Sequence, residues 1–232
     1  MVQSMSRVIV SGEYPHIANQ LRKLGLSVIT TSANPYIAEA VAFHPDMQVL
    51  ALPHKTFVLT GSEYLAEKLN RSVLFTEHPG MQYPKDVLCN GKWIGNTLFC
   101  NSKTIDKTIL SHCESAGIRI VNVHQGYTGC SICKVDEHSI ITSDKSIALK
   151  AKENNFDVLL IREGHIELPG YDYGFIGGCS GKICGNQLIF SGDLSNHPDY
   201  ELITSFIKNK KIEIIQLPNA GLLDIGGIVS VG

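Results

Sequence analysis

The sequence predicts an α/β fold of five ββαβ units arranged around a pseudo-fivefold axis and closed by the C-terminal strand. Three observations support this prediction. One strand-to-helix step recurs five times, a second strand precedes four of these steps, and an unpaired strand stands at the end of the chain. Together they divide a single domain, residues 1–232, into units of approximately 222–231 plus 6–31, 42–77, 85–123, 126–161 and 171–217.

The recurring step is an apolar strand that ends in a small polar residue and then turns into a helix. The five copies lie roughly 40 to 50 residues apart, a regularity typical of an internal repeat. A side-chain oxygen at the strand end is expected to accept hydrogen bonds from the free N–H groups of the first helical turn. The small polar residues are Ser11, Thr60, Asn101, Ser143 and Ser191.

An apolar stripe is expected along the helix of each unit. In the first helix Ile17, Leu21 and Leu24 lie about one turn apart, and in the last helix Leu202 and Phe206 repeat this spacing. One face of each helix is therefore predicted to be buried. A short apolar strand follows each helix: LSVITT (26–31), SVLFTE (72–77), IRIVNV (118–123), FDVLLI (156–161) and IEIIQL (212–217).

A second strand precedes four of the helices and is joined to the repeated strand by a short turn. Alternation of strand and helix alone would suggest a doubly wound parallel sheet, but these hairpins argue against that fold. The unit is therefore ββαβ. The hairpin turns are predicted at Pro53, Asn90–Gly91, Asp136–Glu137 and Gly185–Asn186.

The first unit lacks a leading strand, whereas residues 222–231 form a leading strand with no unit after it. Placing this terminal strand beside the first repeated strand completes the unit and closes the ring, which protects the sheet edges. We therefore expect Ile225 and Val229 to lie near Val8 and Val10.

This arrangement resembles the penteins, the α/β propellers that include guanidine-modifying enzymes and a ribosome anti-association factor. DVLCNGKWIGNTLFCNSKT (86–104) is similar to the third-unit hairpin of dimethylarginine hydrolases. NAGLLDIGGIVSV (219–231) is similar to the closing strand that holds their nucleophilic cysteine. A closer resemblance, carried by ELPGYDYGFIGG (167–178), is to uncharacterised clostridial-type proteins of this fold.

The resemblance implies a thiolate on the closing strand, a histidine on the fourth unit, and carboxylates that hold a guanidinium group. Here the cysteine position falls around Asp224 to Gly227, no cysteine follows Cys184, and the histidine position falls near Tyr127. The chain thus lacks the usual Cys/His pair. The weak substitutes are the thiols of Cys179 and Cys130 and the imidazoles of His44 and His124.

Acidic residues are present at positions where the family has carboxylates, whereas its nucleophilic cysteine is missing. Asp46 opens the second unit, Asp86 opens the third, and Asp224 stands at the nucleophile position, so together they suggest a cation-friendly central cavity. The loop 162–182 is rich in aromatic residues and glycines, and is expected either to take part in binding, with backbone N–H groups near an anion, or merely to plug the ring. The predicted ligand-binding residues are Asp46, Asp86, Tyr127, Asp172, Tyr173, Gly178, Ser180 and Asp224.

No cofactor or metal is predicted. Cys130 and Cys133 have zinc-like spacing and could join Cys179 and Cys184, but on an expected strand their odd separation points them to opposite faces. The seven cysteines form an odd number, and the N-terminus shows no export signal, which favours reduced thiols and a cytoplasmic location.

The charge balance limits the classes of partner. The chain has 20 basic and 22 acidic residues without long blocks of one sign, which argues against binding to nucleic acid. No apolar stretch is long enough to span a bilayer, so no membrane partner is expected. A small-molecule ligand is predicted, and a protein partner or a homo-oligomer stays open.

The leading hypothesis is a pentein that binds a small cationic or zwitterionic metabolite in its central cavity and lacks the usual Cys/His machinery. Two alternatives stay open. One is a hydrolase acting on guanidine or amidine C–N bonds by an altered mechanism, and the other is a pentein that binds the ribosome or another protein. Whether the protein is an enzyme is also open.

Overall fold

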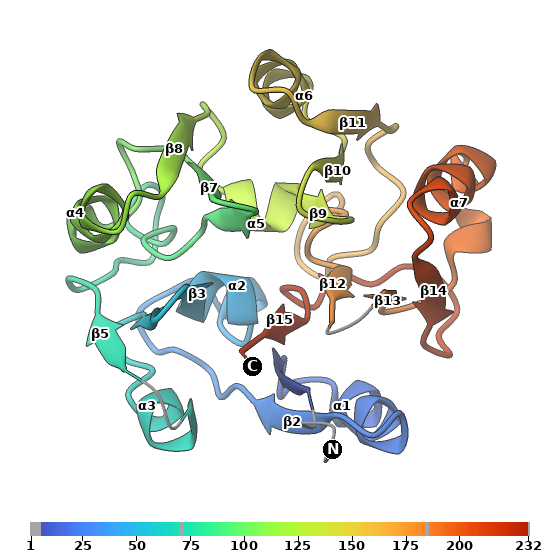
Figure 1. Cartoon of the computed structure of the whole chain (residues 1–232). Helices are drawn as coiled ribbons and strands as arrows, with labels where there is room; N and C mark the ends of the chain where they lie inside the picture. The colour runs from blue at the N-terminus through green and yellow to red at the C-terminus, as the bar shows by residue number, and fades with distance from the viewer. Residues whose placement is uncertain (1–5, 70–71, 184–185, 232) are drawn as a thin grey trace, which may run out of the picture.

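The computed structural model describes residues 6–69, 72–183 and 186–231, in which five three-stranded sheets surround a central axis (Figure 1). In every sheet the middle strand pairs antiparallel with an inner strand and parallel with an outer strand. The five predicted ββαβ units around a pseudo-fivefold axis are therefore confirmed.

The strands fall into three sets of five. The inner strands are β3 (Val49–Leu52), β6 (Lys92–Ile94), β9 (Cys133–Lys134), β12 (Ser180–Lys182) and β15 (Val229–Ser230). The middle strands are β1 (Arg7–Val10), β4 (Lys55–Val58), β7 (Thr97–Cys100), β10 (Ser139–Thr142) and β13 (Gln187–Phe190). The outer strands are β2 (Ser27–Thr30), β5 (Val73–Phe75), β8 (Arg119–Asn122), β11 (Asp157–Leu160) and β14 (Glu213–Gln216).

One helix joins the middle and outer strand of each unit and lies at the periphery of the ring (Figure 1). These helices are α1 (Pro15–Lys23), α3 (Tyr64–Leu69), α4 (Lys107–Ser115), α6 (Lys145–Glu153) and α7 (Tyr200–Asn209). Shorter turns of helix are α2 (Pro45–Gln48), α5 (Thr128–Ser131), η1 (Glu39–Val41) and η2 (Leu194–Asn196). Within the described ranges, no helix has the length and apolar character needed to cross a membrane.

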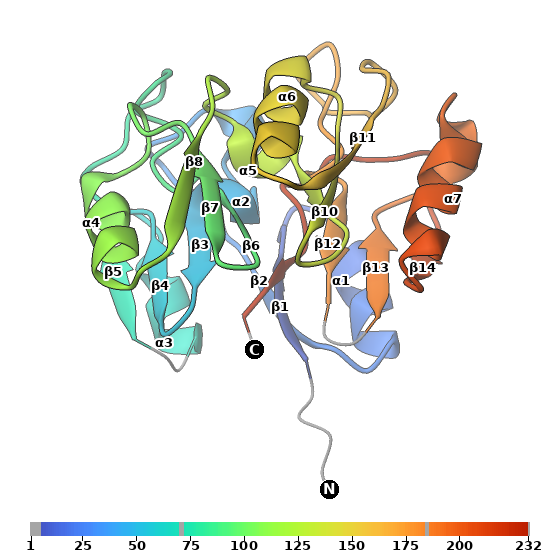
Figure 2. The ribbon, with the colours of Figure 1, turned by 45° about the horizontal axis from the view of Figure 1, so that its top comes forward.

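The C-terminal strand closes the ring as the sequence predicts. β15 pairs antiparallel with β1, with Val8 opposite Ser230 and Ile9 opposite Val229. Ile225 shares a hydrophobic cluster with Val8, so the segment before β15 also packs on the first unit. The start of β1 and the end of β15 consequently lie at the same end of the ring axis (Figure 2).

The helix stripes are confirmed in part. Ile17 and Leu21 are buried, whereas Leu24 is exposed because it follows the last residue of α1 and turns toward solvent. In α7 the buried face is formed by Ile203 and Ile207 instead of Leu202, which is exposed. The error in α7 comes from choosing a stripe one residue away from the face that meets the sheet.

The small polar residues at the strand ends do not cap the helices, contrary to the prediction. Asp106 and Asp144 accept the first N–H groups of α4 and α6 instead. The Ser191 hydroxyl donates to the carbonyls of Cys179 and Leu223. The chain still has to turn after each strand before the helix begins, so a residue at the strand end lies too far from the helix to cap it. The side chain of Ser191 instead forms hydrogen bonds to neighbouring segments.

The hairpin turns are also confirmed in part. β3 and β4 are joined at Pro53 and His54, and Asp136–Glu137 lies in the turn between β9 and β10. The turn predicted at Asn90–Gly91 is wrong, because β6 and β7 turn at Gly95, whose φ is 59°. Of the fourth predicted turn, Gly185 lies outside the described residues, although the flanking β12 and β13 pair antiparallel.

Candidate functional site

A cavity of about 260 Å³ lies among the segments that lead into the inner strands, and we call it the loop cavity. It sits where α2, α5 and the connection from β11 to β12 meet, at the end of the ring away from the termini (Figure 2). Among the residues described, four aromatic rings and two carboxylates line it without any Lys or Arg. Its lining comprises Val41, His44, Met47, Tyr127, Cys130, Leu168, Tyr171, Asp172, Tyr173, Phe175 and Asp224.

Asp224 is the buried acid of the loop cavity, with only 1% of its surface exposed. One carboxylate oxygen accepts the Phe175 N–H at 2.8 Å, and the other accepts the Gly226 N–H at 3.0 Å. A Cβ at Gly178 would lie 2.0 Å from Asp224 Oδ1, so glycine there allows the backbone to pack against the acid. The loop and the closing segment thus fix this carboxylate in one position.

His44 is the nearest ionisable neighbour of Asp224. Its Nδ1 lies 3.8 Å from Asp224 Oδ1, and its Nε2 is buried without a hydrogen-bond partner. Burial lowers the pKa of His44, and the nearby Asp224 offsets only part of that effect. The imidazole is therefore neutral near pH 7 and leaves the buried carboxylate without a compensating positive charge. Among the described residues, His44 is its only ionic neighbour within 4.0 Å.

Asp86 acts on the loop cavity through Tyr127. The Tyr127 hydroxyl donates to Asp86 Oδ2 at 2.5 Å, while Asp86 Oδ1 is buried without a partner. Burial and, to a smaller extent, the neighbouring Asp86 raise the pKa of Tyr127 well above its usual range, which keeps the hydroxyl protonated. Asp86 itself does not line the cavity, so its contribution is to orient the tyrosine.

Asp46 faces a different cavity. It lines a space of about 1010 Å³ among the inner strands, at the end of the ring that carries the termini, and we call this space the strand cavity. Burial and, to a smaller extent, the negative charge of Asp224 raise the pKa of Asp46 to about 7. The expected convergence of Asp46, Asp86 and Asp224 on one cavity is therefore wrong: the acids are neighbours, but they face different spaces.

The aromatic loop lies over the loop cavity, as expected. Tyr171 and Tyr173 are 50% and 37% exposed at its rim beside the exposed Asp172. The predicted free N–H groups near Gly178 and Ser180 are not available, because Gly178 N–H donates to the Cys130 carbonyl at 3.1 Å and Ser180 N–H to the Gly177 carbonyl at 3.3 Å. The backbone of this loop instead binds a carboxylate of the chain itself, that of Asp224.

The four weak catalytic candidates separate in space. Cys179 is buried in the hydrophobic core and His124 is exposed away from the lining, whereas Cys130 and His44 both line the loop cavity. Cys130 lies on α5 and not on a strand, contrary to the prediction. Asn90 Nδ2 donates to Cys130 Sγ at 3.1 Å, and burial raises the pKa of the Cys130 thiol well above its usual range.

We predict that Cys130 reacts slowly with thiol reagents in the native protein, because its neutral thiol is a poor nucleophile. A maleimide time course followed by peptide mapping should show none of the six described cysteines, all buried, labelled ahead of the others until the chain is denatured, when they become reactive. Fast labelling confined to Cys130, and abolished in Cys130→Ser, would contradict this expectation.

Sequence reasoning did not name Tyr171, Phe175 or Asn90 as site residues, nor the apolar lining residues Val41, Met47 and Leu168. Tyr171 and Phe175 belong to the loop that was singled out, and their aromatic character was the available signal. Asn90 was interpreted as a turn residue, but its Oδ1 accepts the Gly129 N–H at 2.7 Å and so anchors α5. Within the described residues, which leave out Cys184, no group of three or more His, Cys, Asp or Glu side chains is arranged to hold a metal ion.

Solved structures of similar fold cover nearly the whole chain. SxtG, an amidinotransferase of saxitoxin biosynthesis from Microseira wollei, matches with a TM-score of 0.62 at 10% identity, covering 98% of this chain and 94% of its own. DDAH from Pseudomonas aeruginosa matches with a TM-score of 0.58 at 11% identity over 92% of both chains. C. jejuni agmatine deiminase matches with a TM-score of 0.56 at 10% identity, covering 98% of this chain and 93% of its own. At these identities the likeness shows the pentein fold alone.

Sequence comparison gives a narrower placement. No curated protein matches the chain. The sequence model of DUF6873, described as a family of unknown function, matches residues 9–229. The chain, a pentein by its fold, therefore belongs to the DUF6873 family.

Proposed function

We propose that the protein binds a small organic cation or zwitterion in the loop cavity and that no cysteine thiolate acts there. The observation that carries this proposal is the lining itself: four aromatic rings and two carboxylates, with no Lys or Arg among the described lining residues. The volume of about 260 Å³ suits a ligand the size of an amino acid.

Electrostatics favours a positively charged group in this cavity. A buried carboxylate without a basic partner is costly, and Asp224 has only the neutral His44 beside it. A ligand cation would supply the missing charge. Aromatic faces attract cations as well, so Tyr171 and Tyr173 at the rim can add to the binding.

The structural neighbours suggest which ligands to try first. The DDAH structure is a complex with citrulline, and the other two neighbours are an amidinotransferase and an agmatine deiminase. Citrulline and agmatine each carry a planar C–N group on a short aliphatic chain. Arginine, citrulline and agmatine therefore form the first panel of candidates for this protein.

A hydrolase of altered mechanism is the second candidate, and one observation favours it: Cys130, His44 and Asp224 line the same cavity. The raised pKa of the Cys130 thiol and the lowered pKa of His44 leave both groups neutral near pH 7, which disfavours a thiolate–imidazolium pair. The alternative of a ribosome- or protein-binding pentein stays a prediction.

Calorimetric titration with arginine, citrulline and agmatine tests the binding proposal. We expect at least one ligand to bind, and we expect Tyr171→Ala and Tyr173→Ala each to weaken it by roughly 2- to 30-fold, the range of a cation–π contact. Asp224→Asn should weaken it by about tenfold or more, because it removes the buried charge.

Glu201→Gln, which alters an exposed carboxylate on α7, serves as the control and should bind like the unmodified protein. Asp224 also orders the backbone at Phe175 and Gly226, so the fold of its variant is checked by circular dichroism. If Asp224→Asn unfolds, Tyr171→Ala and Tyr173→Ala still test the binding proposal. Absence of heat with all three ligands, or unchanged binding by both tyrosine variants, would overturn the proposal.

A further inference from the structure

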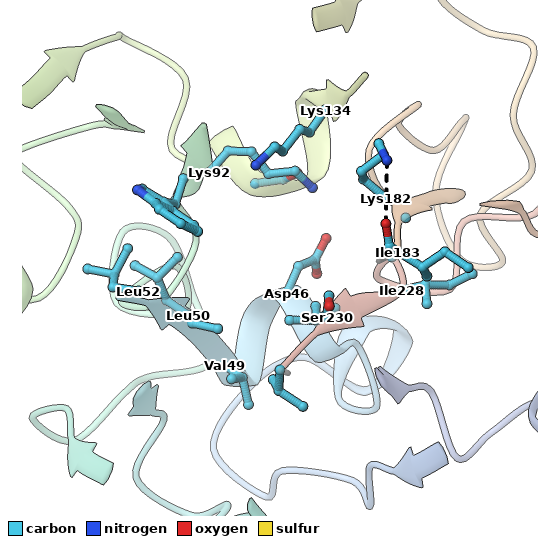
Figure 3. A pocket seen from close by; sticks show the side chains of 18 of the residues that line it. Asp46, Val49, Leu50, Leu52, Lys92, Lys134, Lys182, Ile183, Ile228 and Ser230 are labelled. Atoms are coloured by element: carbon cyan, nitrogen blue, oxygen red, sulfur yellow. Dashed lines mark hydrogen bonds between the residues drawn. The ribbon is translucent and has the colours of Figure 1, made fainter. Parts of the chain in front are cut away.

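The strand cavity is larger than the loop cavity and has a different chemistry. It measures about 1010 Å³ and receives residues from the inner strands of all five units. Figure 3 shows Asp46 near its centre, with Lys92, Lys134 and Lys182 on the surrounding strands. Nothing in the loop-cavity proposal uses this space.

Strand register explains why lysines gather there. Lys134 pairs with Ile140 and Lys182 with Leu188, which are equivalent positions on the middle strands of the fourth and fifth units. Lys92 pairs with Phe99, one position farther along the middle strand of the third unit. Three consecutive units therefore each contribute one lysine to the cavity, and the repeat brings residues far apart in sequence to the lining of one space.

The charge balance of the lining is positive. Among the described residues of the lining, Arg7 and the three lysines stand against two acids, Asp46 and Glu137. Glu137 is already engaged, since its carboxylate lies 2.7 Å from Lys134 Nζ. Asp46 lies close enough to Lys92 for the two to influence each other, and burial lowers the pKa of Lys92. The cavity therefore has basic groups in excess and suits an anion.

Besides the Trp93 indole N–H, Asp46 is the polar group that the described lining leaves without a hydrogen-bond partner. It is 7% exposed, and neither carboxylate oxygen accepts a hydrogen bond of ordinary geometry, although the Cys130 thiol beside it offsets part of the cost of burial. A buried carboxyl without partners is costly, so a ligand group that bonds to it would be favourable. A hydroxyl suits this position, because an ammonium group would be repelled by Lys92.

We propose that the strand cavity binds a small phosphorylated metabolite that carries hydroxyl groups, with the phosphate among Lys92, Lys134 and Lys182 and a hydroxyl at Asp46. A phosphate offers three oxygens and up to two negative charges to three ammonium groups, whereas a carboxylate offers two oxygens and one charge. This site is separate from the loop cavity, so the protein has two ligand sites of opposite charge preference.

The cavity contains its own reporter, because the single tryptophan of the chain, Trp93, lines it. The probes are ribose 5-phosphate, inorganic phosphate and ribose, titrated against tryptophan fluorescence and repeated by calorimetry. We expect saturable binding of ribose 5-phosphate, roughly tenfold or more tighter than inorganic phosphate, because only the sugar phosphate offers a hydroxyl to Asp46. Ribose alone should give no signal.

Variants separate the two halves of the proposed site. Lys92→Gln and Lys134→Gln should each weaken ribose 5-phosphate by about tenfold, with calorimetry preferred for Lys134→Gln because Lys134 Nζ lies 5.1 Å from the centre of the Trp93 ring. Asp46→Asn should reduce the preference for the sugar phosphate over inorganic phosphate. Lys150→Gln, on the peripheral helix α6 and paired with Glu153, is the matched control and should change nothing.

Two results would overturn this inference. One is no saturable binding of either phosphate at millimolar concentration. The other is binding that Lys92→Gln and Lys134→Gln affect no more than Lys150→Gln does. Tyr173→Ala, which alters the loop cavity, should leave phosphate binding unchanged, so failure of one site does not imply failure of the other.

Discussion

Removing residues 222–232 is expected to abolish folding, whereas moving the same segment in front of β1 is expected to preserve it. The segment pairs with β1 and carries five apolar side chains that are buried: Leu222, Leu223, Ile225, Ile228 and Val231. Loss of one large buried aliphatic side chain costs about 2–5 kcal/mol, so loss of several exceeds the roughly 5–15 kcal/mol that holds a domain together.

The circular permutant begins at Gly221, continues through residue 232 into residue 1, and ends at Ala220 in the exposed connection before the closing segment. Ser230 faces Val8, so the residues between them can serve as a hairpin linker. Thermal melting followed by circular dichroism should give a cooperative transition for the permutant and none for the truncated chain. A cooperative native-like transition in the truncated chain would contradict the requirement for closure.

Asp46→Asn is expected to stabilise the protein, increasingly so as the pH rises from 4 to 8. Asp46 has its pKa raised from 3.8 to about 7 by burial and by Asp224. Between these values the folded chain keeps a proton that the unfolded chain has released, so the unfolding free energy falls with rising pH. At about 1.4 kcal/mol per pH unit, the cost approaches roughly 4 kcal/mol above pH 7 and vanishes below pH 4.

The measurement is urea unfolding of both proteins at several pH values. The variant should match the unmodified protein near pH 4 and exceed it by several kcal/mol at pH 8. Asp193→Asn is the control, with an expected change in stability of the opposite sign. The Ser195 N–H donates to the Asp193 carboxylate and lowers its pKa, so loss of this carboxylate should destabilise the protein at neutral pH. An equal effect of Asp46→Asn at every pH would show that Asp46 is not held protonated.

The repeat made most of the fold predictable. Every middle strand is an apolar run followed by a turn and a helix, and this local pattern needs no tertiary information to be recognised. Details that depend on contacts were predicted less well. Asn90–Gly91 has the composition of a hairpin turn, but the Asn90 side chain is recruited by α5, and Gly95 makes the turn instead.

The sequence by itself determined the five units, the closing strand and the presence of acids where the pentein resemblance places a guanidinium site. Only the tertiary structure decided which way those acids face. His44 is the N-cap of α2 and Asp46 lies in its first turn, and side chains two positions apart there point in different directions, so His44 faces the loop cavity while Asp46 faces the strand cavity. Likewise, lysines from three separate units line one cavity only because the ring brings their inner strands together around one axis.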